Sequence, residues 1–318
     1  MPKPVRNSIV LYHSTDLDGK ACGVIGHEYL SRKGVMPHPV GWNYDTDLRE
    51  KKLLQVGGFE KIIIGDLSFT EHTRDQLEWL CGQAERVLWF DHHEVSIPLS
   101  QNLPASNIQA CVQTDRCGAY LMYQGLFPGE VVPQTLVLID DYDRWVHNFP
   151  ESRALNAAIA AAGDFNVGSA NGPGDQLRRA IFRQSVVETC QSLETLIKLT
   201  NVGAEELKKQ ADLNRKLCRR LLFRGALRLK DTAIPCLGIV LSHPCNSDLF
   251  DGYDQETLLV PACFDGNRWH YSLYSRDPEA LHVGKLALAM GGGGHPGAAG
   301  FTSKEFLFVD TVKVEPSN

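Results

Sequence analysis

Three features are missing from this sequence, and each absence excludes a class of protein. None of the nine cysteines stands in a C-x-x-C pair and their number is odd, so neither a disulfide framework nor a zinc knuckle is indicated. No apolar run approaches the roughly 18 residues of a membrane span, and the apolar stretch near the N-terminus is too short for a signal peptide. We therefore expect a soluble cytoplasmic protein with reduced thiols and no membrane partner.

A surplus of positive charge is also missing. The chain has 32 Lys and Arg residues against 38 Asp and Glu residues, which gives a formal net charge of −6. Binding of long duplex nucleic acid calls for a broad basic surface, and processive digestion of long strands calls for a basic track; this composition indicates neither. A small anionic substrate, held by a few local cations or by metal ions, remains compatible with the sequence.

The pattern that is present predicts an α/β fold. The 318 residues, 43% of them apolar, suffice for two domains with their own cores. Short β-branched and aromatic runs at 8–12, 61–66 and 86–91 predict strands of a doubly wound, mainly parallel sheet that is buried on both faces. Helices are expected between and after these strands, at residues 20–32, 71–83, 118–126 and 132–139.

The second half of the chain has a different texture. Residues 154–174 are rich in Ala, Gly and Asn and predict a loop or a loosely packed helical connection, whereas 175–222 has a helical pattern. Beyond Gly225 the pattern changes to short strands, with a hairpin turn at 265–267 and a final helix at 283–290. We therefore expect a first domain, a helical connector and a smaller C-terminal α/β domain, at residues 1–150, 151–224 and 225–318.

Acidic and imidazole side chains follow each predicted strand of the first domain. They are His13, Asp16 and Asp18 after the first strand, Asp66 after the second, and Asp91, His92 and His93 after the third. The sequence IDDYDRW, which follows another apolar run, adds Asp140, Asp141 and Asp143. Because the carboxyl ends of parallel strands meet at one edge of a sheet, we expect these side chains to converge there.

Such a convergence of carboxylates favours divalent cations. Without them, the like charges would repel one another by several kcal/mol in a partly buried site. Oxygen ligands with some imidazole and no thiolate favour Mn²⁺, with Mg²⁺ as the alternative, and six candidate ligands suffice for two ions that share a bridging carboxylate. Two such ions suit phosphoester hydrolysis. Each signal alone is weak, since a single strand-end aspartate is often a helix cap and adjacent histidines also occur at surfaces or in cores.

The C-terminal sequence GGGGHPGAAG is a second candidate site. Consecutive glycines such as Gly293 and Gly294 let the backbone approach a ligand closely and present amide donors to an anion. His295 follows them and is itself followed by small residues, a pattern unlike that of a linker. Upstream, Arg276 ends a predicted strand and is suited to bidentate contact with phosphate, the alternative being an ordinary surface arginine.

The ordered set YHSTDLDG, GD, FDHH, DDYDRW and GGGGHPGAAG resembles the DHH phosphoesterase superfamily with its C-terminal DHH-associated domain. The resemblance spans nearly the whole chain, and the combination of motifs is highly specific. It implies a phosphoesterase with two metal ions, usually manganese. It also implies the metal ligands, which are His13, Asp16, Asp18, Asp66, His92 and Asp141, with Asp143 as the alternative to Asp141.

The resemblance further implies roles for residues that are not metal ligands. His93 would lie near the substrate phosphate, where it polarises the phosphate or protonates the leaving oxygen, and Asp91 would orient a ligand. Substrate binding falls to Arg276 and to the glycine-rich motif. The residues of that motif are Gly293, Gly294 and His295.

The substrate class is also an implication of the resemblance. With two domains and no sensor segment, the chain resembles soluble oligoribonuclease-like exonucleases. Such enzymes cleave short linear oligoribonucleotides or dinucleotides, such as pGpG and pApA, to mononucleotides. Cyclic dinucleotide phosphodiesterase, nucleotide phosphatase and a degenerate nucleotide-binding sensor remain alternatives. Either Tyr274 or Trp145 would stack a base, unless both belong to a core. The sequence leaves open the polarity of cleavage and whether the protein is a monomer or a homodimer.

Overall fold

The computed structural model describes residues 7–314 except 45, 183–185, 231, 246, 254 and 255, and it does not describe the side chains of 186–192. The chain divides into two compact units, Met1–Glu206 and Leu207–Asn318, and each is described by itself. The three domains that we expect from the sequence stay a proposal. Within the described residues, no helix is long and apolar enough to cross a membrane.

The first unit is built on a five-stranded sheet in the order β2-β1-β3-β4-β5, with every neighbouring pair parallel. The strands are β1 Asn7–His13, β2 Met36–Trp42, β3 Phe59–Gly65, β4 Ala84–Asp91 and β5 Ile108–Val112. The predicted doubly wound parallel sheet and its three predicted strands are thereby confirmed. The two edge strands, β2 and β5, were not predicted. The apolar pattern of β2 is interrupted by Pro37 and Pro39, which an edge strand tolerates.

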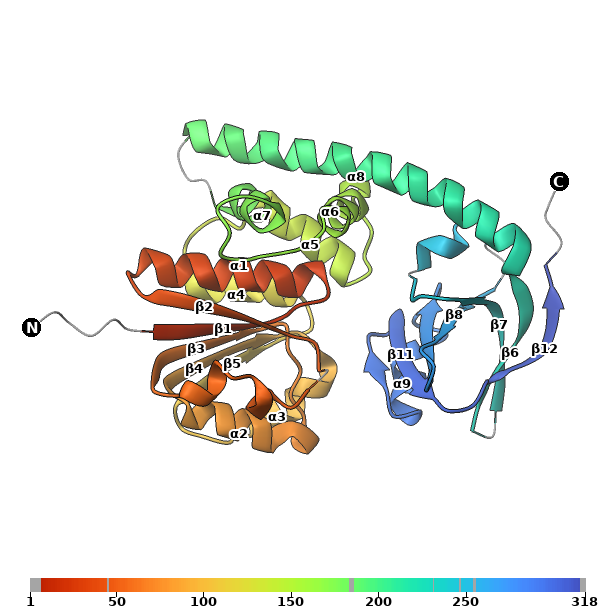
Figure 1. The fold of residues 1–318 in the computed structure, drawn as a ribbon, viewed down its shortest axis with the longest axis horizontal. Coiled ribbons are helices and arrows are strands. Elements are labelled where there is room, and N and C mark those ends of the chain that lie inside the picture. The colour runs from red at the N-terminus through yellow and green to blue at the C-terminus, as the bar shows by residue number, and fades with distance from the viewer. Residues whose placement is uncertain are drawn as a thin grey trace, which may run out of the picture. The chain divides into compact units, whose positions relative to one another are not determined.

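Helices cover both faces of this sheet, as Figure 1 shows: α1 and α4 lie over one face and α2 and α3 over the other. Consecutive residues of β1 therefore enter different cores. Val10 packs in the cluster that includes α1 and α4, whereas Ile9 and Leu11 pack in the cluster on the opposite face. This burial on both faces explains why the strand sequences are continuous apolar runs and do not alternate between apolar and polar residues.

The helices of the first unit agree largely with the predicted ones. They are α1 Leu17–Arg32, α2 Arg74–Gly82, α3 Ile97–Gln101, α4 Gly118–Leu126, α5 Gln134–Asp143, α6 Pro150–Ala161 and α7 Pro173–Ile181. Single 3₁₀ turns lie at Leu48–Glu50, Leu54–Val56, Glu71–Thr73 and Glu94–Ser96. Of the two alternatives for 154–174, a loop or a helical connection, the helical one holds as far as Ala161, because the alanines there continue a regular helix that Pro150 begins.

The long helix α8, Val186–Leu221, begins in the first unit and ends in the second. The second unit has a mixed seven-stranded sheet in the order β10-β11-β9-β8-β7-β6-β12, in which β7 and β8 are parallel and the other neighbours antiparallel. Its strands are β6 Phe223–Leu229, β7 Thr232–Leu241, β8 Leu258–Phe264, β9 Trp269–Ser275, β10 Gly293–Gly294, β11 Ala298–Ser303 and β12 Phe308–Lys313. A 3₁₀ turn lies at Ser247–Phe250, and α9, Val283–Ala289, packs against the sheet. The predicted turn at 265–267 does join β8 to β9, where Asp265 N donates to Arg268 O.

Candidate active site

The first part of the site lies where β1 passes into α1. Asp16 caps this helix, because its Oδ1 accepts a hydrogen bond from Gly19 N at 2.9 Å. A Cβ atom at Gly19 would lie 2.1 Å from His13 O, so only glycine fits this turn. His13 Nδ1 lies 2.6 Å from Asp16 Oδ2 and 3.5 Å from Asp66 Oδ2, which brings three predicted ligands together.

Asp18 lies in the first turn of α1 and is buried. Its two carboxylate oxygens accept hydrogen bonds from the backbone amides of Gly118 and Ala119, each at 2.8 Å. These amides are two of the unpaired donors at the N-terminus of α4, whose helix dipole also favours a negative charge. Asp18 is therefore fixed by a second helix.

Asp66 directly follows β3 and occupies the centre of the cluster. Its backbone has φ +55°, a strained value for a residue with a side chain, and its amide donates to Phe90 O on the neighbouring strand at 2.9 Å. Oδ2 faces His13, and Oδ1 lies 3.3 Å from His92 Nε2. One carboxylate thus lies between two groups of candidate ligands, the arrangement expected of a bridging ligand.

The residues after β4 have three different environments. His92 is buried, and its Nε2 lies 3.2 Å from Asp143 Oδ2 and 3.6 Å from Asp18 Oδ2. Asp91 is fully buried, and its Oδ1 accepts a hydrogen bond from Nδ1 of His93 at 2.7 Å. This bond fixes the ring of His93, which is partly exposed to solvent.

The structure places Asp143, the alternative to Asp141, beside the other candidate ligands. The two aspartates are two positions apart on α5, so they point in different directions. The carboxylate of Asp143 faces His92, whereas that of Asp141 accepts hydrogen bonds from Asn148 N at 2.8 Å and Phe149 N at 3.2 Å. Asp141 therefore stabilises the segment that follows α5, and Asp143 belongs to the cluster.

The donor set fits divalent metal ions. Within the first unit, three groups of residues have possible ligand atoms within 4.8 Å of one another. They are His13 with Asp16 and Asp66, Asp18 with His92 and Asp143, and Asp66 with Asp91 and His93. Among the described residues, the buried oxygens Asp66 Oδ1, Asp91 Oδ2 and Asp143 Oδ2 accept no hydrogen bond. Buried carboxylate oxygens that accept no hydrogen bond are costly, and a bound cation would satisfy them.

The carboxylates of the cluster do not titrate alike. Burial raises the pKa of Asp143 to about 7, with His92 opposing the rise and Asp66 adding to it. Burial, together with the charges of Asp66 and Asp143, holds the pKa of Asp18 well above its usual range. For Asp66, burial also acts upward, but the neighbouring imidazoles of His13, His92 and His93 outweigh it and lower the pKa. Asp66 thus stays ionised.

The histidines of the cluster hold protons in the absence of metal. Burial lowers the pKa of His13, but hydrogen bonds with Asp16 and Asp66 outweigh this effect and raise it to about 10. Burial likewise opposes protonation of His92, and the neighbouring carboxylates, Asp143 foremost, raise its pKa well above the ordinary value. A histidine that coordinates a metal must lose the proton from its ligating nitrogen, so metal and protons compete for these rings.

The predicted substrate-binding residues lie in the second unit. Gly293 and Gly294 form β10 and pair with β11, and a Cβ atom at Gly294, where φ is +139°, would lie 2.5 Å from Ala299 Cα. His295 N donates to Ala298 O at 2.7 Å and so closes the turn between β10 and β11. The glycines therefore serve a tight hairpin as well as the predicted approach to a ligand.

The geometry of Arg276 was not foreseen. This residue follows β9 and is exposed. Its Nη2 donates to the backbone oxygens of Phe250 and Tyr253, at 3.1 and 2.6 Å. Arg276 thus ties the segment after the 3₁₀ turn to the end of β9, and its contact with phosphate stays a prediction.

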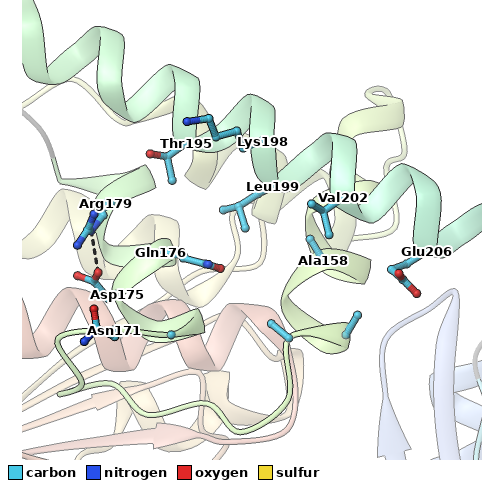
Figure 2. Close-up of a pocket in the computed structure, with 13 residues that line it drawn as sticks. Ala158, Asn171, Asp175, Gln176, Arg179, Thr195, Lys198, Leu199, Val202 and Glu206 are labelled. Carbon is cyan, nitrogen blue, oxygen red and sulfur yellow. Dashed lines mark ion pairs between the residues drawn. The ribbon is translucent and has the colours of Figure 1, made fainter.

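A separate cavity of about 580 Å³ lies between α6, α7 and α8 in the first unit, and Figure 2 shows its lining. Its charged side chains include Asp175, Arg179, Lys198 and Glu206. Arg179 Nε lies 2.7 Å from Asp175 Oδ2, so this cation already has an internal partner. None of the predicted site residues lines this cavity.

Comparison with known proteins yields remote relatives. No family model matches the chain. An uncharacterized protein, R106 of Acanthamoeba polyphaga mimivirus, is 23% identical over 310 residues, an alignment that covers 92% of this chain and 66% of the relative. The chain therefore spans slightly less than two thirds of the length of this curated relative.

Solved structures are similar over almost the whole chain. An exopolyphosphatase-related protein from Bacteroides fragilis is 12% identical with a TM-score of 0.50, and the alignment covers 95% of this chain and 88% of that one. RecJ from Thermus thermophilus in complex with Mn²⁺ is 16% identical with a TM-score of 0.49, covering 93% and 49% of the two chains. A pGpG-specific phosphodiesterase from Vibrio cholerae is 16% identical with a TM-score of 0.43, covering 94% and 92%. At 12% identity, the similarity to the Bacteroides fragilis structure concerns the fold alone.

Proposed function

We propose that this chain, which has the DHH phosphoesterase fold, is a manganese-dependent phosphodiesterase that hydrolyses short linear oligoribonucleotides or dinucleotides to mononucleotides. The observation that supports it most is the position of Asp66. Its two oxygens face two groups of candidate ligands, which contain His13 on one side and His92 on the other. A shared carboxylate of this kind would hold two metal ions close together, as two-metal phosphoester hydrolysis requires.

The proposed metal ligands are carboxylates and imidazoles that converge from β1, α1, β3, β4 and α5. They are His13, Asp16, Asp18, Asp66, His92 and Asp143. Two divalent ions held by this set would bind phosphoryl oxygens and lower the pKa of a bound water. The protein supplies the rest: Asp18 is fixed by the N-terminus of α4, so the cluster is preorganised rather than assembled on binding.

We assign to His93 the transfer of a proton to the leaving oxygen. Its Nδ1 is bonded to Asp91, which orients the ring and raises the pKa of His93 against the opposing effect of burial. A protonated imidazole is the form that can donate. Asp91 therefore acts through His93. In the second unit, the glycine-rich motif and Arg276 keep their predicted role in binding the terminal phosphate and sugar of the substrate.

Product analysis tests the proposal directly. Purified protein with Mn²⁺ is offered a linear 5′-phosphorylated diribonucleotide, its cyclic counterpart and a mononucleotide, and the products are separated by chromatography. We expect cleavage of the linear substrate. Cleavage of the cyclic substrate alone would identify a cyclic dinucleotide phosphodiesterase, and cleavage of the mononucleotide alone would identify a phosphatase.

Matched variants connect the activity to the cluster. Asp66→Ala and His92→Ala should abolish turnover, while Asp164→Ala and His72→Ala, at exposed positions of the same unit, should retain it. Binding of the dinucleotide without turnover in the unaltered protein, at any Mn²⁺ concentration, would reject the enzyme and favour a nucleotide sensor.

A further inference from the structure

A group of cationic and aromatic side chains beside the metal cluster has no role in the mechanism above. It consists of Arg116, which precedes α4, and of residues at and after the end of α5. The latter are Tyr142, Arg144, Trp145 and His147. Arg144 directly follows Asp143, whose carboxylate lies 3.2 Å from His92 Nε2.

Two guanidinium groups share one carboxylate here. Arg144 binds Asp140 in a bidentate manner, with Nε 2.9 Å from Oδ1 and Nη2 3.1 Å from Oδ2. Arg116 Nη1 lies 3.7 Å from Asp140 Oδ2, and its guanidinium carbon lies 5.1 Å from the centre of the Tyr120 ring. Arg116, Arg144 and Asp140 together carry one net positive charge. This cationic cluster can therefore bind an anion such as phosphate while the ion pair between Arg144 and Asp140 is kept.

The backbone places this cationic cluster next to the candidate metal ligands. Asp140 Oδ1 accepts a hydrogen bond from Cys117 N at 2.7 Å, and Asp18 Oδ2 accepts one from the next amide, Gly118 N, at 2.8 Å. Two consecutive amides of one helix terminus thus hold a carboxylate of the cationic cluster and one of the metal cluster. A phosphate on the arginines would be close to the reacting phosphodiester.

Aromatic residues flank Arg144 in the sequence. The ring centres of Trp145 and His147 lie 4.6 Å apart in an edge-to-face arrangement, and Tyr142 lies 6.5 and 5.8 Å from them. Tyr142 and Trp145 are half-buried and His147 is exposed. Partly exposed aromatic rings beside a cation are what recognition of a nucleobase with its phosphate requires.

The backbone of this segment is held in a strained conformation. Trp145 and His147 have φ values of +62° and +53°, which non-glycine residues adopt only at a cost of about 1–3 kcal/mol each. Asp141 fixes both: its carbonyl oxygen accepts from Val146 N at 3.0 Å and His147 N at 3.2 Å, and its carboxylate binds the two following amides. Such strain accumulates where a particular placement of side chains is needed.

We infer that this group is a nucleotide subsite of the proposed phosphodiesterase, in which Arg116 and Arg144 bind a phosphate and Trp145 with His147 stacks the attached base. The inference rests on the proposed function and narrows its substrate class. The substrate would be a nucleotide with an aromatic base. Inorganic polyphosphate and simple phosphodiesters would lack half of the contacts.

Ligand binding tests the subsite without requiring hydrolysis. Adenosine 5′-monophosphate and ribose 5-phosphate are titrated by calorimetry in the presence of Ca²⁺, which neutralises oxygen ligands. We expect the base to increase affinity about tenfold, in line with the roughly 1–3 kcal/mol of one stacked base. Trp145→Leu should remove this advantage and Trp145→Phe should restore most of it, while Arg116→Ala should weaken both ligands about tenfold.

Controls separate the possible outcomes. Arg268→Ala, an exposed arginine of the second unit, should bind both ligands as the unaltered protein does. Unchanged affinities in Trp145→Leu and Arg116→Ala, with circular dichroism spectra equal to the parent, would overturn the subsite. Base-dependent binding without dinucleotide cleavage would reject the proposed hydrolysis and leave the subsite, whereas cleavage with an unchanged KM in both variants would reject the subsite alone.

Discussion

The carboxylate of Asp18 accepts a hydrogen bond from the backbone amide of Gly118 at 2.8 Å, across a sequence separation of 100 residues. This bond connects the first turn of α1 to the first turn of α4. A Cβ atom added at Gly118 would lie 3.0 Å from both Asp18 Oδ2 and Asp66 Cβ. The lack of a side chain at this position thus lets two candidate ligands and a helix terminus meet.

Gly118→Ala should accordingly weaken metal binding. The added methyl group displaces the carboxylates of Asp18 and Asp66 by a few tenths of an ångström, and we expect the affinity for Mn²⁺ to fall about tenfold, or about 1.4 kcal/mol. Titration calorimetry with the metal-free protein measures the affinity for Mn²⁺. Gly82→Ala, at a glycine of α2 with no atom within 4 Å of the added Cβ, is the matched control. Equal affinities in the two variants would show that the contact at Gly118 is of no consequence.

Asp143 and Asp141 offer a direct contrast, because they lie on one helical turn and have different partners. Asp143→Asn removes a candidate ligand, so we expect kcat to fall at least about a hundredfold while the fold is retained. Asp141→Asn replaces an acceptor of two backbone amides by a group that also donates, so the free energy of unfolding should fall by about 1–3 kcal/mol. Measurements of kcat and of the free energy of unfolding in denaturant, made on both variants, test these two expectations. If Asp141→Asn lost metal binding and Asp143→Asn did not, the assignment made here would be reversed.

The sequence predicted the residues at the strand ends because their position follows from local pattern alone. The apolar runs locate the ends of β1, β3 and β4, and parallel strands bring His13, Asp66 and His92 to one edge whatever the rest of the chain does. The choice between Asp141 and Asp143 could not be made that way. It depends on where α5 ends and which way its last turn faces, and those are set by packing against other helices.

The second unit shows a different limit of sequence-based prediction. The run AAGFTS forms β11, although glycine and alanine have low strand propensity, because Tyr271 and Leu273 of β9 provide the pairing partners. The segment after α5 shows the same limit. The positive φ values at Trp145 and His147 arise from hydrogen bonds to Asp141, and no local pattern in DDYDRWVHN predicts these φ values.

Metal affinity should rise with pH. Burial raises the pKa of Asp143 to about 7, so below this pH the metal must displace a proton from a candidate ligand. We expect the apparent dissociation constant for Mn²⁺ to fall by at least about tenfold for each pH unit between 5 and 7. It should keep falling above pH 7, because His13 and His92, whose pKa values are also raised, must lose a proton when they bind the metal. Calorimetry in buffers of different ionisation enthalpy would count the released protons. Binding without proton release at pH 6 would contradict a protonated Asp143.

The metal-free protein should behave in the opposite way and lose stability as pH rises. Asp143 has a pKa of about 7 in the folded chain, above its unfolded value, so its contribution to stability is present at low pH and disappears as the proton leaves. The raised pKa of His92 has the same sign, because a protonated imidazole among carboxylates stabilises the fold and is lost at higher pH. Melting temperatures measured with a chelator should therefore fall from pH 6 to pH 8, and saturating Mn²⁺ should abolish the decline. Asp143→Asn, which has no proton to lose, should flatten the profile of the metal-free protein. A decline just as steep in this variant would locate the titrating group elsewhere.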